Sequence, residues 1–106
     1  MLFSRTRSIT PAEALEQQRA GGLVLVDVRE PAEVRQGRIK GARNIPLGQL
    51  GTHLGELERG KPVAFVCQSG MRSARATKAA AKAGLDAVNV SGGVAGWSRA
   101  GLPLAR

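Results

Sequence analysis

The only cysteine of the chain lies where an apolar segment meets a polar loop and then an alanine-rich segment. Residues 63–66 predict a buried strand and residues 73–83 predict a helix, so Cys67 stands at a strand-to-helix junction. Unpaired N–H groups and the positive end of a helix dipole lower the pKa of a thiol at such a junction. Because the thiolate is the nucleophilic form, the pattern predicts a cysteine that attacks or carries an anionic group.

The residues after Cys67 suit an anion-binding loop. Gly70 permits backbone angles closed to other residues, and successive N–H groups can form a nest for an anion. Arg72 can fork onto an oxyanion, and Ser73 can cap the helix or hydrogen-bond the sulfur. A cysteine at a strand end can also be only a small hydrophobic residue, but this loop favours the nucleophile. The predicted binding loop comprises Gln68, Ser69, Gly70, Met71, Arg72 and Ser73.

Strands alternate with helices along the chain. Thr10, Pro11 and Glu13 form a capping-box start for the first helix. The apolar strands lack a clear period of two, as expected when both faces of a sheet are covered. We therefore expect an α/β, doubly wound domain with a mainly parallel sheet of about five strands and helices on both faces. The expected strands are an edge strand near residue 9 and the segments 23–28, 42–45, 63–66 and 87–90; the expected helices are 11–20, 31–36, 47–57, 73–83 and 92–97.

Length and composition indicate one globular domain. The chain has 106 residues, of which 42% are hydrophobic, and we expect a single domain with a loosely ordered segment at residues 1–7. No apolar run is long enough for a membrane helix, and the N-terminus does not resemble a signal peptide. One cysteine excludes an internal disulfide and suits a reducing compartment. We therefore expect a cytoplasmic protein with no membrane partner.

The formal net charge of +8 raises the question of a nucleic-acid partner. The basic residues are dispersed, and no basic run contains the aromatic residues on which bases stack. We expect a solvated basic surface and no nucleic-acid partner, with a modest attraction for anionic substrates.

Several motifs, in order, resemble the single-domain members of the rhodanese family of sulfurtransferases. Each motif is weak alone, but the ordered set spans most of the chain. The family commonly has Gly-His-Ile where this chain has arginine at position 38. The matching segments are residues 27–30 with Glu33, then 37–47, 66–73, 92–97 and 101–103.

The resemblance implies a mechanism of sulfur transfer. The Cys67 thiolate attacks the sulfane sulfur of thiosulfate or of a low-molecular-weight persulfide, and a Cys67 persulfide forms. A thiol, cyanide or a protein acceptor then removes the sulfur, in two steps with ping-pong kinetics. Arg72 would orient the oxyanion of the donor or hold the loop through its own hydrogen bonds. The resemblance implies no metal and no organic cofactor.

Two other functions remain open at this point. One is a sulfur-relay module that receives persulfide sulfur from a partner protein. The other is a phosphatase of the related fold. Such phosphatases place one residue more between cysteine and arginine than the four found here between Cys67 and Arg72. They also need a general acid, and neither Asp27 nor Asp86 is well placed for that task.

Other polar residues allow both a functional and a structural interpretation. Asp27 and Arg29 flank the end of a strand, where open α/β sheets place their sites and where they could contact the cysteine loop. We favour the structural interpretation, a local ion pair or hydrogen-bond set that includes Glu33, because buried charges need partners. Arg43 could attract anions to the mouth of the site or be a solvated arginine. His53 lacks cysteine partners for a metal site, and Trp97 is expected in the core.

Overall fold

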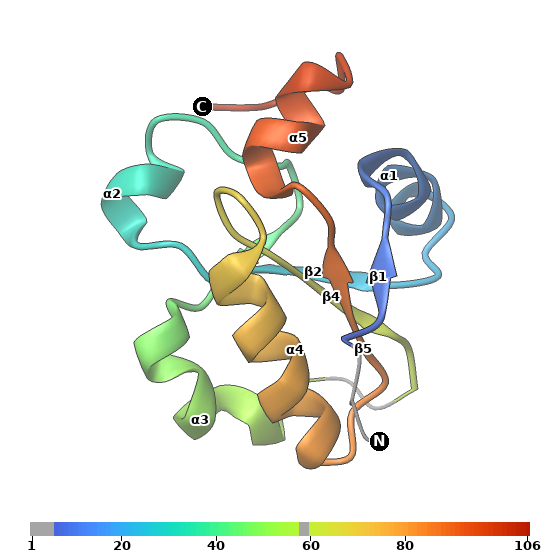
Figure 1. Ribbon diagram of the computed structural model, residues 1–106, viewed down its shortest axis with the longest axis vertical. Coiled ribbons are helices and arrows are strands. Elements are labelled where there is room, and N and C mark those ends of the chain that lie inside the picture. The colour runs from blue at the N-terminus through green and yellow to red at the C-terminus, as the bar shows by residue number, and fades with distance from the viewer. Residues whose placement is uncertain (1–5, 58–59) are drawn as a thin grey trace.

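A five-stranded sheet of order β1-β5-β4-β2-β3 forms the centre of the molecule, and every strand pair is parallel. The computed structural model describes residues 6–57 and 60–106. This architecture confirms the predicted α/β fold, including the short edge strand near residue 9 (Figure 1). The strands are β1 (Ser8–Ile9), β2 (Val24–Asp27), β3 (Arg43–Asn44), β4 (Val63–Val66) and β5 (Ala87–Val90).

Helices cover both faces of this sheet (Figure 1). The helices are α1 (Pro11–Arg19), α2 (Pro31–Val34), α3 (Leu50–His53), α4 (Met71–Lys82) and α5 (Gly93–Arg99), with 3-10 turns η1 (Leu47–Gln49) and η2 (Leu54–Glu56). Phe65 of β4 packs in one cluster with Leu50 and Ala80. Its neighbour Ala64 packs in the other with Ala14 and Trp97. Alternate strand residues therefore face α3 and α4 on one side and α1 and α5 on the other.

The predicted helices differ from the observed ones at several bounds: α2 ends at Val34 and α5 continues to Arg99. The expected helix 47–57 is divided into η1, α3 and η2, because three glycines, Gly48, Gly51 and Gly55, weaken a continuous helix. The helix expected to begin at Ser73 begins at Met71, directly after Gly70, whose φ of 115° turns the chain into it. The predicted capping box of α1 is confirmed, since Thr10 and Glu13 exchange hydrogen bonds of 2.8 and 3.1 Å.

The expected loosely ordered segment 1–7 lies largely outside the described residues. Of its described part, Arg7 accepts a hydrogen bond from the Asn89 N–H at its carbonyl oxygen and forms an exposed ion pair with Asp86. Within residues 6–57 and 60–106, no helix has the length and apolar character needed to cross a membrane.

Candidate active site

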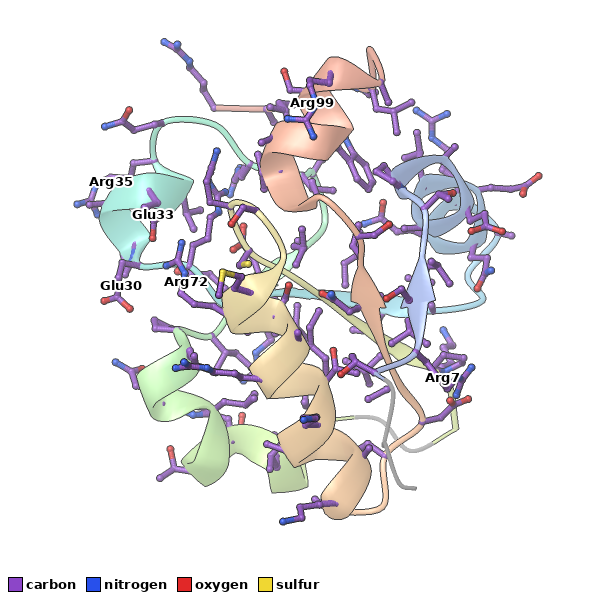
Figure 2. All side chains as sticks on the ribbon, viewed as in Figure 1. Arg7, Glu30, Glu33, Arg35, Arg72 and Arg99 are labelled. Atoms are coloured by element: carbon purple, nitrogen blue, oxygen red, sulfur yellow. The ribbon has the colours of Figure 1, made fainter. Side chains whose placement is uncertain are left out.

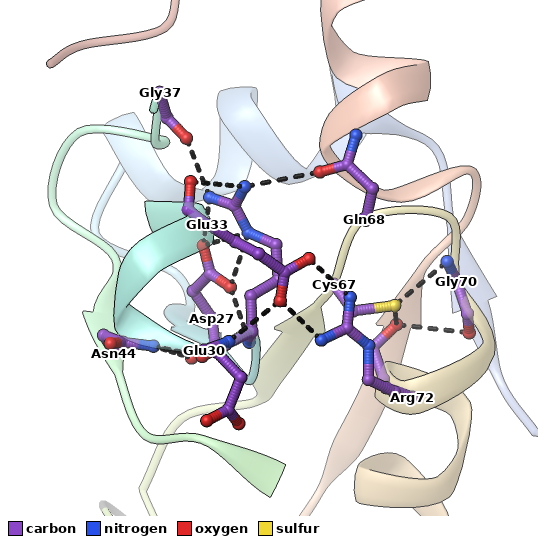
Figure 3. Close-up of polar contacts among 11 residues, drawn as sticks. Asp27, Glu30, Glu33, Gly37, Asn44, Cys67, Gln68, Gly70 and Arg72 are labelled. Carbon is purple, nitrogen blue, oxygen red and sulfur yellow. Dashed lines mark hydrogen bonds and ion pairs between the residues drawn. The ribbon is translucent and has the colours of Figure 1, made fainter. Parts of the chain in front are cut away.

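The register of the sheet brings the candidate residues to one edge. β2 and β4 are neighbours, and Asp27 is aligned with Val66, the residue before Cys67. The Val28 N–H donates to the Val66 carbonyl oxygen at 2.9 Å, so the two chains leave the sheet side by side. Parallel strands end at the same edge, and Arg29 therefore donates to the side chain of Gln68, the residue after Cys67, at 3.3 Å. Figure 3 shows Gln68 and Cys67 in this network.

The Cys67 thiol is enclosed by hydrogen-bond donors. The residue is 1% exposed, and its sulfur accepts from the Gly70 N–H at 3.0 Å and from the Ser73 hydroxyl at 3.3 Å. The first turn of α5 supports the loop from behind, because the Val94 N–H donates to the Cys67 carbonyl oxygen at 2.8 Å. The loop is therefore held by the bond from Gly70 to the sulfur and by the bond from α5 to the Cys67 backbone.

These contacts set the acidity of the thiol. Burial raises the pKa of Cys67, but hydrogen bonds from the Ser73 hydroxyl and from the backbone N–H groups of Ser73, Gly70 and Ser69 outweigh it. The pKa is therefore below that of an ordinary thiol, in the direction that the sequence predicts. The largest lowering contributions come from neutral donors at the start of α4, rather than from Arg72.

Asn89 belongs to this network and was not expected from the sequence. Its carboxamide oxygen accepts from the Ser73 hydroxyl at 2.5 Å, and its amide nitrogen donates to the Gly70 carbonyl oxygen at 3.3 Å. The single Ser73 proton thus has three acceptors within reach, the Cys67 sulfur, the Gly70 carbonyl oxygen and the Asn89 carboxamide oxygen. Asn89 is the polar residue of an otherwise apolar strand, residues 87–90. This pattern could have indicated its role, because buried polar groups need hydrogen-bond partners.

Replacing Ser73 with alanine is expected to raise the pH midpoint for alkylation of Cys67. The substitution removes the hydroxyl that donates to the sulfur and leaves burial to disfavour the thiolate. Alkylation rate by iodoacetamide as a function of pH measures this midpoint. Ser91→Ala removes an exposed hydroxyl bonded to the Ile9 carbonyl oxygen, and serves as the control. An unchanged midpoint in Ser73→Ala would show that this hydroxyl does not stabilise the thiolate.

Arg72 does not present a free guanidinium to the loop. Its Nη1 and Nη2 donate to the two carboxylate oxygens of Glu33 at 2.7 and 2.8 Å (Figure 3). The Arg72 hydrogen bonds hold the pKa of Glu33 down at about 2, so the carboxylate is ionised at neutral pH. Glu33 lies in α2 and also accepts from the Glu30 N–H at 3.0 Å. The Arg72 side chain therefore holds the start of α4, directly after the cysteine loop, against α2.

Arg29 and Asp27 form the local ion pair that the sequence left as one alternative. The Arg29 Nη2 lies 2.8 Å from the Asp27 carboxylate, and their side chains are 3% and 2% exposed. The same guanidinium donates to the carbonyl oxygens of Glu33 and Gly37 and to the Gln68 side chain. Arg29 therefore connects the end of β2, the segment after it and the cysteine loop.

A pocket of about 650 Å³ opens beside the loop, between α2 and α5. Gln68, the residue after the cysteine, lines it together with Glu33 and Arg99. Met71, at the other side of the loop, is 75% exposed. Arg43 instead forms an exposed ion pair with Glu56 at 2.5 Å.

Position 38, where the family commonly has histidine, is held by its backbone. The Arg38 N–H and carbonyl oxygen exchange hydrogen bonds with Ala105 at 2.8 and 2.7 Å, while the residue itself is exposed.

Trp97 and His53 lie outside the site. Trp97 is fully buried in the core, as predicted, and its indole N–H donates to the Pro103 carbonyl oxygen. His53 is partly buried, and one of its ring nitrogens lies 2.9 Å from the Gln49 carbonyl oxygen.

Comparisons with known proteins identify the class of this fold and site. The rhodanese-like domain family matches residues 10–100, and the chain therefore belongs to that family. It is 35% identical over 96 residues to a sulfurtransferase of Allochromatium vinosum, covering 88% of this chain and 90% of the relative. It is 45% identical over 85 residues to the uncharacterized protein YqhL of Bacillus subtilis, covering 77% and 68%. A rhodanese-related protein of Thermoplasma volcanium superposes with a TM-score of 0.87 at 37% identity, covering 93% and 97%. These similarities support a sulfurtransferase or sulfur-relay role.

Proposed function

We propose that this chain is a sulfurtransferase in which Cys67 carries the transferred sulfur as a persulfide. The observation that supports this most is the sulfur of Cys67 itself, buried, with a lowered pKa, and held among N–H and O–H donors. The expected donor is thiosulfate or a low-molecular-weight persulfide, and the expected acceptor is a thiol, cyanide or a protein. A thiol that must stay reduced suits the cytoplasm, which we propose as its compartment.

The transfer proceeds by two displacements at sulfur. The Cys67 thiolate attacks the sulfane sulfur of thiosulfate, the S–S bond of the donor breaks, and sulfite leaves with the electron pair. The acceptor then attacks the outer sulfur of the persulfide and restores the Cys67 thiolate. The donors around the sulfur, including the Gly70 N–H and the Ser73 hydroxyl, stabilise negative charge in both steps. Neither step needs a metal or an organic cofactor.

The phosphatase alternative lacks a proton donor among the candidate acids. Asp27 is buried in its ion pair with Arg29, and Asp86 is paired with Arg7 at the opposite end of β5. Glu33 has a pKa of about 2, so it is ionised at neutral pH and has no proton to give a leaving group. We therefore place phosphate-ester hydrolysis below sulfur transfer. Hydrolysis of an aryl phosphate that is lost in Cys67→Ser would reverse that order.

A sulfur-relay role is the second candidate, and the match to the rhodanese-like family supports it as well as the enzyme. Met71, which is 75% exposed directly after the cysteine loop, is accessible to a partner protein. A relay module would accept sulfur quickly from a cysteine desulfurase and slowly from thiosulfate. Comparing persulfide formation from the two donors distinguishes the relay from the small-molecule enzyme.

Initial-rate kinetics test the proposed enzyme. With thiosulfate and cyanide varied together, we expect parallel double-reciprocal lines, because the donor product leaves before the acceptor reacts. Treatment with a chelator should leave the rate unchanged. Intersecting lines would indicate that both substrates bind before transfer, and would contradict a free persulfide intermediate.

A further inference from the structure

Both arginines in the network around Cys67 are already paired with a carboxylate. Arg29 binds Asp27, and Arg72 binds Glu33 (Figure 3). The chain as a whole has a formal net charge of +8, but these two ion pairs bring almost no net charge to the loop. The positive charge of the chain attracts anions from a distance, but neither arginine of this network is unpaired where the anion would meet the reacting sulfur.

The Arg72–Glu33 pair is the one that a donor can reach, since its side chains are 35% and 34% exposed while Asp27 is buried. Of the two, Glu33 lines the pocket beside the loop, so a donor in that pocket meets its carboxylate (Figure 2). The hydrogen bonds to Glu33 are the main cause that raises the pKa of Arg72, and the Cys67 thiolate adds a smaller contribution, so the sulfur and the Arg72–Glu33 pair interact electrostatically. Because the Coulomb energy scales with the product of charges, neutralisation of Arg72 by Glu33 removes more attraction from a dianionic donor than from a monoanionic one.

The pocket beside the loop offers a second, independent observation. Its volume of about 650 Å³ exceeds what a small inorganic donor needs, and it reaches Gln68, the neighbour of the reacting residue. Arg99, on the α5 wall, is exposed and forms no ion pair within the described ranges of the chain (Figure 2). Part of the lining is apolar, from Ala32, Val94, Ala95 and Leu104.

We infer that the site is built for organic sulfane donors that bring a single negative charge, and that Glu33 is the residue that selects them over thiosulfate. This inference rests on the proposed sulfurtransferase function. The organic group lies in the pocket between α2 and α5, and the sulfane sulfur reaches Cys67. Glu33 neutralises the charge of Arg72, which would otherwise stabilise the second negative charge of a dianionic donor.

Benzenethiosulfonate is a suitable probe of this class, because it carries one charge and an apolar ring. The Cys67 thiolate attacks its sulfane sulfur, the S–S bond breaks, and benzenesulfinate leaves with the electron pair. Thiosulfate reacts by the same bond changes and differs in charge and in having no organic group. Comparing kcat/KM for the two donors with a common acceptor therefore isolates the selectivity of the site.

Two substitutions separate charge from space. Glu33→Gln keeps the size of the side chain and removes its charge, and we expect kcat/KM for thiosulfate to rise about 3–10-fold, with a smaller rise for benzenethiosulfonate. The gain should shrink as salt is added, because the carboxylate is partly exposed. Ala32→Leu narrows the pocket at an exposed position, and should lower kcat/KM for benzenethiosulfonate while leaving thiosulfate within about twofold.

Glu16→Gln makes the same change of net charge on the exposed part of α1 and should leave the donor preference unchanged. A wild-type preference for thiosulfate, or an equal fall for both donors in Glu33→Gln, would overturn the inference, since Glu33 would then only position Arg72. If neither donor placed sulfur on wild-type Cys67, the proposed function itself would fail, which is a separate result.

Discussion

Gly93→Ala is expected to destabilise the domain by about 2–4 kcal/mol and to reduce sulfur loading of Cys67 severely. Gly93 has φ of 62°, and an added Cβ would lie 2.4 Å from the Cys67 carbonyl oxygen and 2.5 Å from the Gln68 carbonyl carbon. These are backbone atoms of the cysteine loop, so no flexible side chain can move away to relieve the overlap. Either α5 or the loop must shift, and the bond from the Val94 N–H to Cys67 would be strained.

Gly21→Ala is the matched control for this prediction. Gly21 also has positive φ, 75°, but an added Cβ would meet no heavy atom within 4 Å. It should cost about 1–2 kcal/mol through backbone strain alone and leave sulfur loading intact. Urea unfolding measures the stability of both variants, and mass spectrometry measures loading. Equal losses in the two variants would show that the contact between α5 and the loop is unimportant.

Arg29→Ala is expected to cost about 3–5 kcal/mol of stability, the range found when one member of a buried ion pair is removed. It would leave the Asp27 carboxylate, only 2% exposed, without its guanidinium partner. It would also remove the donors to the Gly37 carbonyl oxygen and the Gln68 side chain, which connect the segment after β2 to the cysteine loop. We therefore expect a loss of activity even where the variant remains folded.

Arg43→Ala provides the comparison, because its ion pair with Glu56 has side chains 47% and 53% exposed. An exposed pair contributes about 0–1 kcal/mol, so this variant should unfold close to wild type. Thermal and urea unfolding of both variants give the difference. A similar small loss for Arg29→Ala would mean that Asp27 finds another partner or takes up a proton.

The sequence predicts the architecture well because the relevant signals are local. Apolar strands, glycine-terminated helices and the capping box at Thr10 each act within a few residues, and the alternation of elements implies a parallel sheet. The position of Cys67 at the end of β4 follows from the same local pattern. Once β2 and β4 are neighbours, their shared edge brings Arg29 beside the cysteine loop.

The parts that could not be predicted depend on contacts between distant segments. Glu33 and Arg72 are 39 residues apart, so no spacing rule shows that the carboxylate occupies the guanidinium. Asn89 reaches Ser73 only because β5 lies next to β4. The helix expected over 47–57 illustrates a different limit, since the leucine spacing is helical while the glycines between interrupt the helix.

The mass of the Cys67 peptide, after brief incubation with a sulfane donor and removal of the excess, tests most directly whether Cys67 carries the transferred sulfur. Thiosulfate and benzenethiosulfonate should each be tried, with Cys67→Ser as the reference. We expect one additional sulfur atom on the peptide that contains Cys67, lost on addition of cyanide and absent from Cys67→Ser. A native, reduced protein whose Cys67 peptide gains no sulfur from either donor would contradict it.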